Sequence, residues 1–145
     1  MQMRTLKFFV VFIAAICCSH AFAAQNNPRI QEMREIEGVS YTEMRIDKLA
    51  ELIGEETLDM IGVDRPAFCC TFMSDGDEAS KSLRKVIEEI VADQAYKVVS
   101  DIVDGDDGDR VRRIALPNDA GSNEEMFIEV SSGNSPGTIL VFVSE

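Results

Sequence analysis

The clearest pattern in the chain is a helical stripe of apolar residues near its middle. Apolar side chains recur three and four positions apart between residues 78 and 94, at Leu83, Val86, Ile87, Ile90 and Val91, which is the spacing of one face of an α-helix. Before the stripe, Asp75 and Glu78 have the D-x-x-E spacing of an N-terminal cap. The sequence therefore predicts an amphipathic helix over residues 78–94 whose apolar face suits packing on a sheet.

Short apolar runs rich in β-branched and aromatic residues lie on both sides of this helix. One run precedes it at residues 67–73, and four follow at residues 96–103, 110–116, 126–131 and 138–143. Turns rich in Gly, Asp, Asn and Pro separate the later runs, and such short connections favour antiparallel neighbours. The predicted fold class is therefore α+β, with amphipathic helices packed on one face of a mainly antiparallel sheet of about five strands that ends in a four-stranded meander.

The region before the first strand is predicted to be helical. Ser40 and Glu43 have the spacing of a capping box, and apolar residues follow at helical intervals as far as Ile53. Gly54 interrupts this pattern, and a second short helix is predicted over residues 55–61. Residues 24–34 are polar and lack periodicity, which indicates a flexible leader, so the single α+β domain is predicted to cover residues 35–145.

The beginning of the chain, residues 1–23, has the pattern of a secretory signal peptide. Arg4 and Lys7 precede an eleven-residue run without charge, and small residues occupy the −3 and −1 positions of a cleavage site. The run is much shorter than the roughly 20 residues needed to span a bilayer, so no transmembrane segment is expected. We therefore expect export to the periplasm or cell envelope, with cleavage between Ala23 and Ala24.

Composition narrows the chemistry further. The chain has 26 acidic and 14 basic residues, which gives a net charge of −12. Because the basic residues are also scattered, nucleic acid is not expected as a partner. The single histidine, His20, lies in the predicted signal peptide, so the mature chain lacks the imidazole that Ser-His, Cys-His and most zinc sites need. With no nucleophile or phosphate-binding motif in view, the sequence predicts neither catalysis nor a cofactor.

Several segments of the chain occur in an order shared by a known family. Residues 38–41 read Gly-Val-Ser-Tyr, an aromatic strand and a long amphipathic helix ending near Tyr96 come next, and an Asp-Gly hairpin then leads into two closing strands. From Met33 to Val143 this order resembles exported Bacteroidetes proteins that share the domain of unknown function 4252. The resemblance implies an α+β fold and an exported protein. The family has no established activity, so no site residues are implied.

An acidic turn at residues 103–109 contains four aspartates and two glycines. This composition is typical of calcium-binding loops. The spacing of an EF-hand loop is not met, because Gly108 stands where a ligand is needed and Ala115 where the loop requires Glu. A tight turn between two strands accounts for the same residues, so no metal site is predicted. A weak calcium site is the alternative, with Asp104, Asp106 and Asp109 as its ligands.

Cys69 and Cys70 are the thiols that remain after removal of the signal peptide. Adjacent Cα atoms lie about 3.8 Å apart, below the usual range for a disulfide, and adjacent residues of a strand point to opposite faces. We therefore expect two buried thiols with no disulfide between them. The alternative is a vicinal disulfide formed in an oxidising periplasm, which would require a distorted peptide.

Both faces of the closing strands are apolar, which predicts that the protein acts by presenting a surface. Leu140 and Phe142 alternate with apolar neighbours in the last strand, and Phe127 alternates with apolar neighbours in the strand before it. One face is expected to pack under the long helix. The other face is covered either by the first helix or by a ligand, a partner or a second copy of the chain. Phe127, Leu140 and Phe142 are the candidate binding residues.

These observations favour a non-enzymatic exported accessory or binding protein of the cell envelope. Its expected partner is an envelope protein or a small apolar ligand, and homo-oligomers are compatible with the sequence. The alternative is a small secreted ligand-binding or inhibitor-like protein, because a helix over a meander is also the shape of cystatins. An enzyme that uses carboxylates alone ranks third, because acids on an exposed helix face, here Glu88, Glu89 and Asp93, usually serve solubility.

Overall fold

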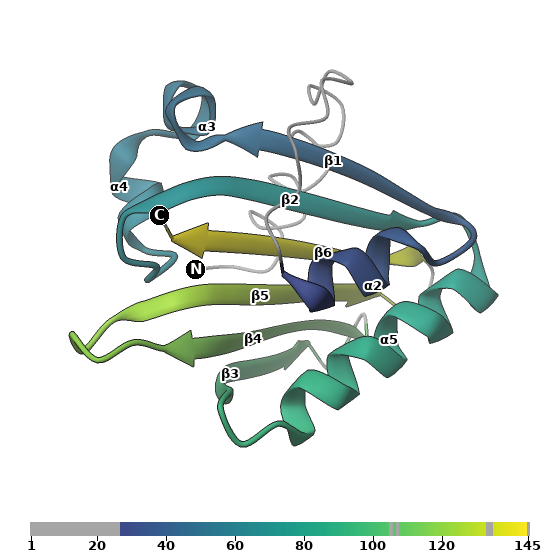
Figure 1. The fold of residues 1–145 in the computed structure, drawn as a ribbon. Helices are drawn as coiled ribbons and strands as arrows, with labels where there is room; N and C mark the ends of the chain where they lie inside the picture. Colours follow the sequence, from purple (N-terminus) through teal and green to yellow (C-terminus); the bar gives the residue numbers. More distant parts are fainter. Residues whose placement is uncertain (1–26, 105, 107, 133–134, 145) are drawn as a thin grey trace.

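The computed structural model describes residues 27–104, 106, 108–132 and 135–144 (Figure 1). The predicted signal peptide lies outside these residues. In chain order the elements are α2 (Pro28–Arg34), β1 (Val39–Arg45), α3 (Ile46–Ile53), α4 (Glu55–Asp59), β2 (Pro66–Ser74), α5 (Asp77–Ala92), β3 (Lys97–Asp104), β4 (Asp109–Pro117), β5 (Asn123–Ser132) and β6 (Ser135–Ser144). None of the helices in the described part of the chain is long and apolar enough to cross a membrane.

The six described strands form one antiparallel sheet in the order β1-β2-β6-β5-β4-β3. The strands β3 to β6 are the predicted meander, and β6 lies beside β2, which joins the meander to the β1–β2 pair (Figure 1). The α+β class, the antiparallel sheet and the closing meander are therefore confirmed. The sixth strand is β1, which the sequence pattern does not reveal.

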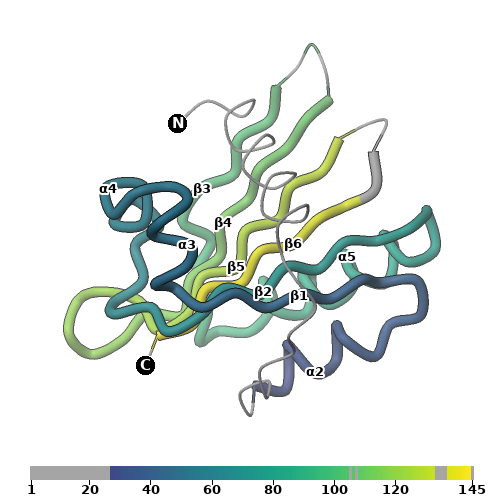
Figure 2. The backbone as a smooth tube through the Cα atoms, turned by 90° about the horizontal axis from the view of Figure 1, so that it is seen from above, coloured from purple at the N-terminus to yellow at the C-terminus, as the bar shows by residue number. Residues whose placement is uncertain are grey.

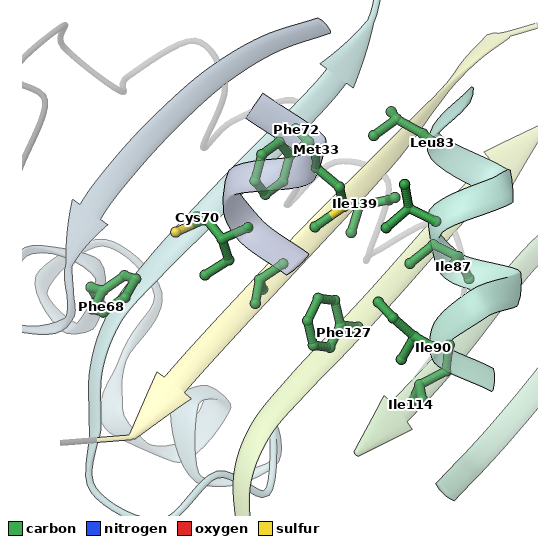
Figure 3. Close-up of a cluster of buried hydrophobic side chains, with 13 residues drawn as sticks. Met33, Phe68, Cys70, Phe72, Leu83, Ile87, Ile90, Ile114, Phe127 and Ile139 are labelled. Carbon is green, nitrogen blue, oxygen red and sulfur yellow. The ribbon is translucent and has the colours of Figure 1, made fainter. Parts of the chain in front are cut away.

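One face of the sheet is covered by α5, as the apolar stripe of this helix predicts. The stripe residues Leu83, Val86, Ile87 and Ile90 are at most 4% exposed. They pack with side chains from β2, β4, β5 and β6, and α2 adds two more that are fully buried (Figure 3). We call this cluster the α5-side core; its sheet and α2 members include Phe68, Cys70, Phe72, Ile114, Phe127, Ile139, Ile30 and Met33.

The N-terminus of α5 differs from the prediction in one detail. The helix begins at Asp77 after Gly76, and no side chain forms a capping hydrogen bond there. The D-x-x-E cap predicted for Asp75 and Glu78 is therefore absent. The acidic residues of the first turn, Asp77 and Glu78, still favour this end of the helix because they interact with the positive end of the helix dipole.

The opposite face of the sheet carries a second hydrophobic cluster, the α3-side core. Leu49 of α3 and Leu58 of α4 pack in this cluster with residues of β2, β5 and β6, among them Cys69, Leu140 and Phe142. The two helices lie together at one end of the sheet, where α3 contacts β1 and β2 (Figure 2). The helices are thus divided between the two faces, and the first helical region does cover part of the second face.

The segment predicted to open the first helix is instead the edge strand β1. Tyr41 and Glu43 pair with residues of the α5-side face of β2, while Thr42 and Met44 pair with residues of its other face. The capping-box prediction is therefore wrong, and the helix begins only at Ile46. Val, Tyr and Thr favour extended backbone, and the hydrogen bonds to β2 outweigh a local S-x-x-E spacing.

The segment predicted as a flexible leader contains the short helix α2. The side chain of Asn27 accepts hydrogen bonds from the backbone N–H groups of Arg29 and Ile30, at 2.9 and 3.3 Å, and Pro28 occupies the first turn. Ile30 and Met33 are 0% exposed. The prediction is wrong for residues 28–34, because two apolar side chains suffice to dock the helix but are too few to form a recognisable period.

Two serines link the beginning of β6 to the end of β2 and the first turn of α5. The hydroxyl oxygens of Ser74 and Ser80 lie 2.6 Å apart. The Ser74 hydroxyl donates to the carbonyl of Gly137 at 3.1 Å, and the N–H of Gly137 donates to the Ser80 hydroxyl at 3.2 Å. These bonds join the β2–α5 connection to β6, which lies about 60 residues later in the sequence.

Candidate functional site

The helices α3 and α4 lie at one corner of the sheet (Figure 2). Residues of both helices line a pocket of about 520 Å³. Its walls come from the end of β1, from both helices, from Val63 and from the first two residues of β2. We call it the corner pocket; its apolar lining consists of Ile46, Ala50, Leu58, Val63, Pro66 and Ala67.

The corner pocket depends on the break between α3 and α4. Gly54 has a φ of 86°, in the left-handed region that a residue with a Cβ atom enters at a cost. Its N–H donates to the carbonyl of Ala50 at 2.9 Å and so caps α3. Because α4 begins at the next residue, Glu55, both short helices line the same pocket without an intervening loop.

The rim of the corner pocket is charged and mainly acidic. Arg45 and Asp47 form an exposed ion pair with a distance of 3.4 Å between Nε and Oδ1. Glu55 and Asp59 also line the pocket, and within the described residues neither takes part in an ion pair. The pocket therefore offers an apolar lining beside two carboxylates that are available to a cation.

The candidate binding residues from the sequence do not share one face. Phe127 is 0% exposed and belongs to the α5-side core (Figure 3). Leu140 and Phe142 are 0% and 1% exposed and belong to the α3-side core. Phe127 is therefore part of the packing beneath α5 and not of the second face. Leu140 and Phe142 do lie on the second face, but neither lines the corner pocket.

The acidic hairpin joins β3 to β4. Asp104 ends β3 and pairs with Asp109 at the start of β4. The carboxylate of Asp104 accepts a hydrogen bond from the backbone N–H of Asp106 at 3.1 Å, and its carbonyl accepts one from Gly108 at 2.9 Å. Over the residues that the structure describes, no group of three or more His, Cys, Asp and Glu side chains is arranged to hold a metal. Gly105 and Asp107 of this hairpin lie outside them.

The two cysteines point to opposite faces of β2, as adjacent strand residues should. Cys69 lies in the α3-side core and Cys70 in the α5-side core, and both remain thiols. The Cys70 sulfur lies 3.4 Å from the hydroxyl of Tyr41, which also hydrogen-bonds the carboxylate of Glu43. The guanidinium carbon of Arg34 lies 4.3 Å from the centroid of the Tyr41 ring.

Burial sets the protonation of this thiol and phenol. It raises the pKa of Cys70 to about 12, and it raises the pKa of Tyr41 together with the hydrogen bonds to Cys70 and Glu43. Both groups keep their protons at neutral pH. Because the thiolate is the reactive form of cysteine, the raised pKa of Cys70 disfavours nucleophilic chemistry at this thiol.

Two acids of α5, Glu88 and Glu89, form ion pairs with arginines outside the helix. Glu88 lies 2.6 Å from the guanidinium of Arg112, which is buried and also lies 2.9 Å from Glu129. Glu89 lies 3.2 Å from Arg29. These two carboxylates face cations in the sheet and on α2 and are 54% and 41% exposed, so they do not form the desolvated pair that glycosidase chemistry requires.

The corner pocket cannot be predicted from the sequence, because its lining comes from four short segments and no local sequence pattern indicates how they pack together. The only local signal is Gly54 between two short helical stretches. Comparisons with models of protein families, with curated proteins and with solved structures found no match to this chain. The resemblance to the domain of unknown function 4252 therefore stays a prediction.

Proposed function

We propose that the protein is a non-enzymatic, exported binding protein of the cell envelope that takes a small ligand in the corner pocket. The ligand class is a molecule with an apolar body and a cationic group. One observation carries this proposal: the corner pocket combines an apolar lining with the carboxylates of Glu55 and Asp59 at its rim.

The dimensions of the pocket support ligand binding. Sites for small molecules usually enclose about 300–1,000 Å³ and combine mainly apolar walls with a few polar groups. The corner pocket, at about 520 Å³, falls within this range. An apolar body would contact Leu58 and Ala50, and a cationic group would reach the acidic rim without removing its charge from water. This supports the ligand-binding form of the two functions expected from the sequence.

The chemistry of the described residues supports a role without catalysis. The Cys70 thiol, which has a raised pKa, and the ion-paired acids of α5 do not present the activated groups that turnover needs. Export is inferred from the basic and apolar pattern of residues 1–23.

The proposal is tested with two probes that share one chain and differ in the charge of the head group. Octylammonium and octyl sulfate are titrated into the isotopically labelled protein, and the backbone amide resonances are followed by NMR. Octylammonium should shift the resonances of α3, α4 and residues 63–67, whereas octyl sulfate should bind more weakly. Shifts that are equal for both probes, or that lie elsewhere in the sheet, would contradict the proposal.

Two substitutions in α4 provide a matched comparison. Glu55→Lys reverses a charge at the rim of the corner pocket, whereas Glu56→Lys reverses the adjacent charge, which does not line the pocket. Loss of one exposed ion pair should weaken octylammonium binding by about fivefold in Glu55→Lys and leave it unchanged in Glu56→Lys. Equal affinities in the two variants would show that the rim does not select the cation.

A further inference from the structure

The edge strand β3 exposes most of the apolar side chains that the described residues leave open to solvent. Of the residues that the structure describes, six large apolar side chains are exposed, and four of these lie on β3: Val98, Val99, Ile102 and Val103, at 46–61%. β3 is the last strand of the sheet, so its outer edge pairs with no described strand. A long edge of this kind recruits another strand unless it is covered or interrupted.

The other edge of the sheet is protected. β1 is contacted by α2 and by α3, and its members Glu43 and Met44 are buried. Among the described residues, no helix packs against β3 as α2 and α3 pack against β1. Val99 and Val103 are 52% and 61% exposed, and β3 contains no Pro that would interrupt pairing at its edge. The contrast between the two edges indicates that β3 is left open for a specific contact.

A β-bulge at Val99 sets the faces of β3. Lys97 pairs with Ala115 and Val98 with Ile114, but the next pairs are Ser100 with Arg113 and Asp101 with Arg112, so Val99 is an extra residue. Val103 then pairs with Arg110, four positions from Ile114 in β4. Side chains alternate along a strand, so Val98 and Val103 lie on the same face. By the same reasoning Lys97 and Asp104 share the other face, because their partners Ala115 and Asp109 are six positions apart.

This arrangement makes the edge complementary to itself. When two copies of β3 pair antiparallel about a two-fold axis, the first residue of each strand lies beside the last residue of the other. In the register that places Lys97 beside Asp104 of the second copy, Val98 lies beside Val103 of the second copy, and each pair shares one face. Without the bulge, residues 98 and 103 would be on opposite faces and this register would not be available. We propose that β3 is a dimer interface that joins two copies of the chain into one continuous antiparallel sheet.

The charges on β3 fit a second copy. Asp101 is held by Arg110 of the same chain through bonds of 2.8 and 2.6 Å. The charges left on the strand are therefore Lys97 at its beginning and Asp104 at its end. Antiparallel pairing brings these opposite charges together twice, once on each side of the two-fold axis. This local complementarity offsets the repulsion expected between two chains that each carry a net charge of −12, and the inference is independent of the corner pocket.

The experiment is a charge exchange across the interface. The protein expressed from its full-length sequence is studied by sedimentation velocity across micromolar concentrations, with Lys97→Asp, Asp104→Lys and the double variant beside it. Each single variant should weaken the dimer by about tenfold, because two opposite-charge contacts become two like-charge contacts. The double variant should restore the dimer. Lys81→Asp, at an exposed position of α5, makes the same change of charge away from β3 and should leave the dimer unchanged.

Hydrogen exchange supplies a second readout that does not depend on substitution. Amides of residues 97–104 should exchange more slowly as the protein concentration rises, because pairing protects the outer edge. The proposal is overturned if the protein stays monomeric, or if neither single variant weakens the dimer. It is also overturned if the edge becomes protected only when a different envelope protein is added, because the occupant would then be another chain.

Discussion

Truncation of Phe127 tests how the sheet is packed beneath α5. The side chain is 0% exposed, and its ring lies 5.9 Å from the ring of Tyr96 at an interplanar angle of 73°. It belongs to the cluster that also holds Ile87 and Ile90 (Figure 3). Phe127→Ala therefore removes a whole ring from a site enclosed by both the sheet and the helix, and also removes an edge-to-face contact.

The expected loss can be set from this burial. Replacement of a fully buried Phe by Ala costs about 3–5 kcal/mol, because the transfer of the ring and the cavity left behind both contribute. A domain of this size has a total stability of about 5–15 kcal/mol. The substitution should therefore remove a large share of the free energy of unfolding and lower the melting temperature by well over about 10 °C.

Urea unfolding followed by circular dichroism measures this loss directly, provided that the slope of the free energy against urea is unchanged. Met60→Ala is the control, because Met60 is 61% exposed and its truncation should cost no more than about 0.5 kcal/mol. Phe142→Ala should behave like Phe127→Ala, since Phe142 is 1% exposed in the α3-side core. A loss below about 1 kcal/mol for Phe127→Ala would refute the assignment of this ring to the core.

Further outcomes follow from other features of the chain. Gly38→Ala should lower the free energy of unfolding by about 2 kcal/mol or more, because φ is 86° and a Cβ would lie 2.6 Å from a carboxylate oxygen of Asp75. Gly54→Ala has the same φ but open space around the Cβ, and should lower it by about 1 kcal/mol; urea unfolding measures both losses. Burial raises the pKa of Cys70 from its ordinary value of 9.0 to about 12. The contribution of this thiol to stability should therefore be complete below pH 9 and fall as pH rises toward 12, because the unfolded thiol loses its proton first; Cys70→Ala should flatten this part of the curve of unfolding free energy against pH. Millimolar calcium should leave the melting temperature unchanged, and a rise of several degrees abolished by Asp106→Ala would show a metal site. Intact-mass analysis of exported protein should find Ala24 at the N-terminus, and a retained signal segment or a lipidated cysteine would contradict this.

The elements that the sequence predicts well are those with a long and unambiguous period. In α5 the helical spacing from Leu83 to Ile90 agrees with every one of the buried positions there. Turn residues separate the consecutive strands of the meander. In both cases local preference and tertiary packing favour the same structure, which is why α5 and the meander can be predicted without a three-dimensional model.

The elements that the sequence does not predict are those whose structure is determined by contacts with distant segments of the chain. Residues 40–53 fit a helical stripe, yet Tyr41 and Glu43 belong to a strand because β2 offers them hydrogen bonds. α2 is ordered by the burial of Ile30 and Met33 beneath the sheet. The bulge at Val99 depends on its register with β4, and the corner pocket depends on four segments at once. Local sequence carries little information about any of these, since the deciding contacts come from distant residues.

The apolar character of β6 on both faces has a consequence for folding. Where one face of a strand is polar, a slip of one residue moves its apolar side chains into solvent, so the slipped register is unfavourable. In β6 such a slip would exchange Leu140 and Phe142 with Ile139 and Val141, burying apolar groups in either register. Hydrophobicity alone therefore does not choose between the two pairings with β2. Gly137 forms hydrogen bonds with Ser74 and Ser80 in the observed register. A slip of one residue would break these bonds, so the two serine hydroxyls favour the observed pairing of β6 with β2.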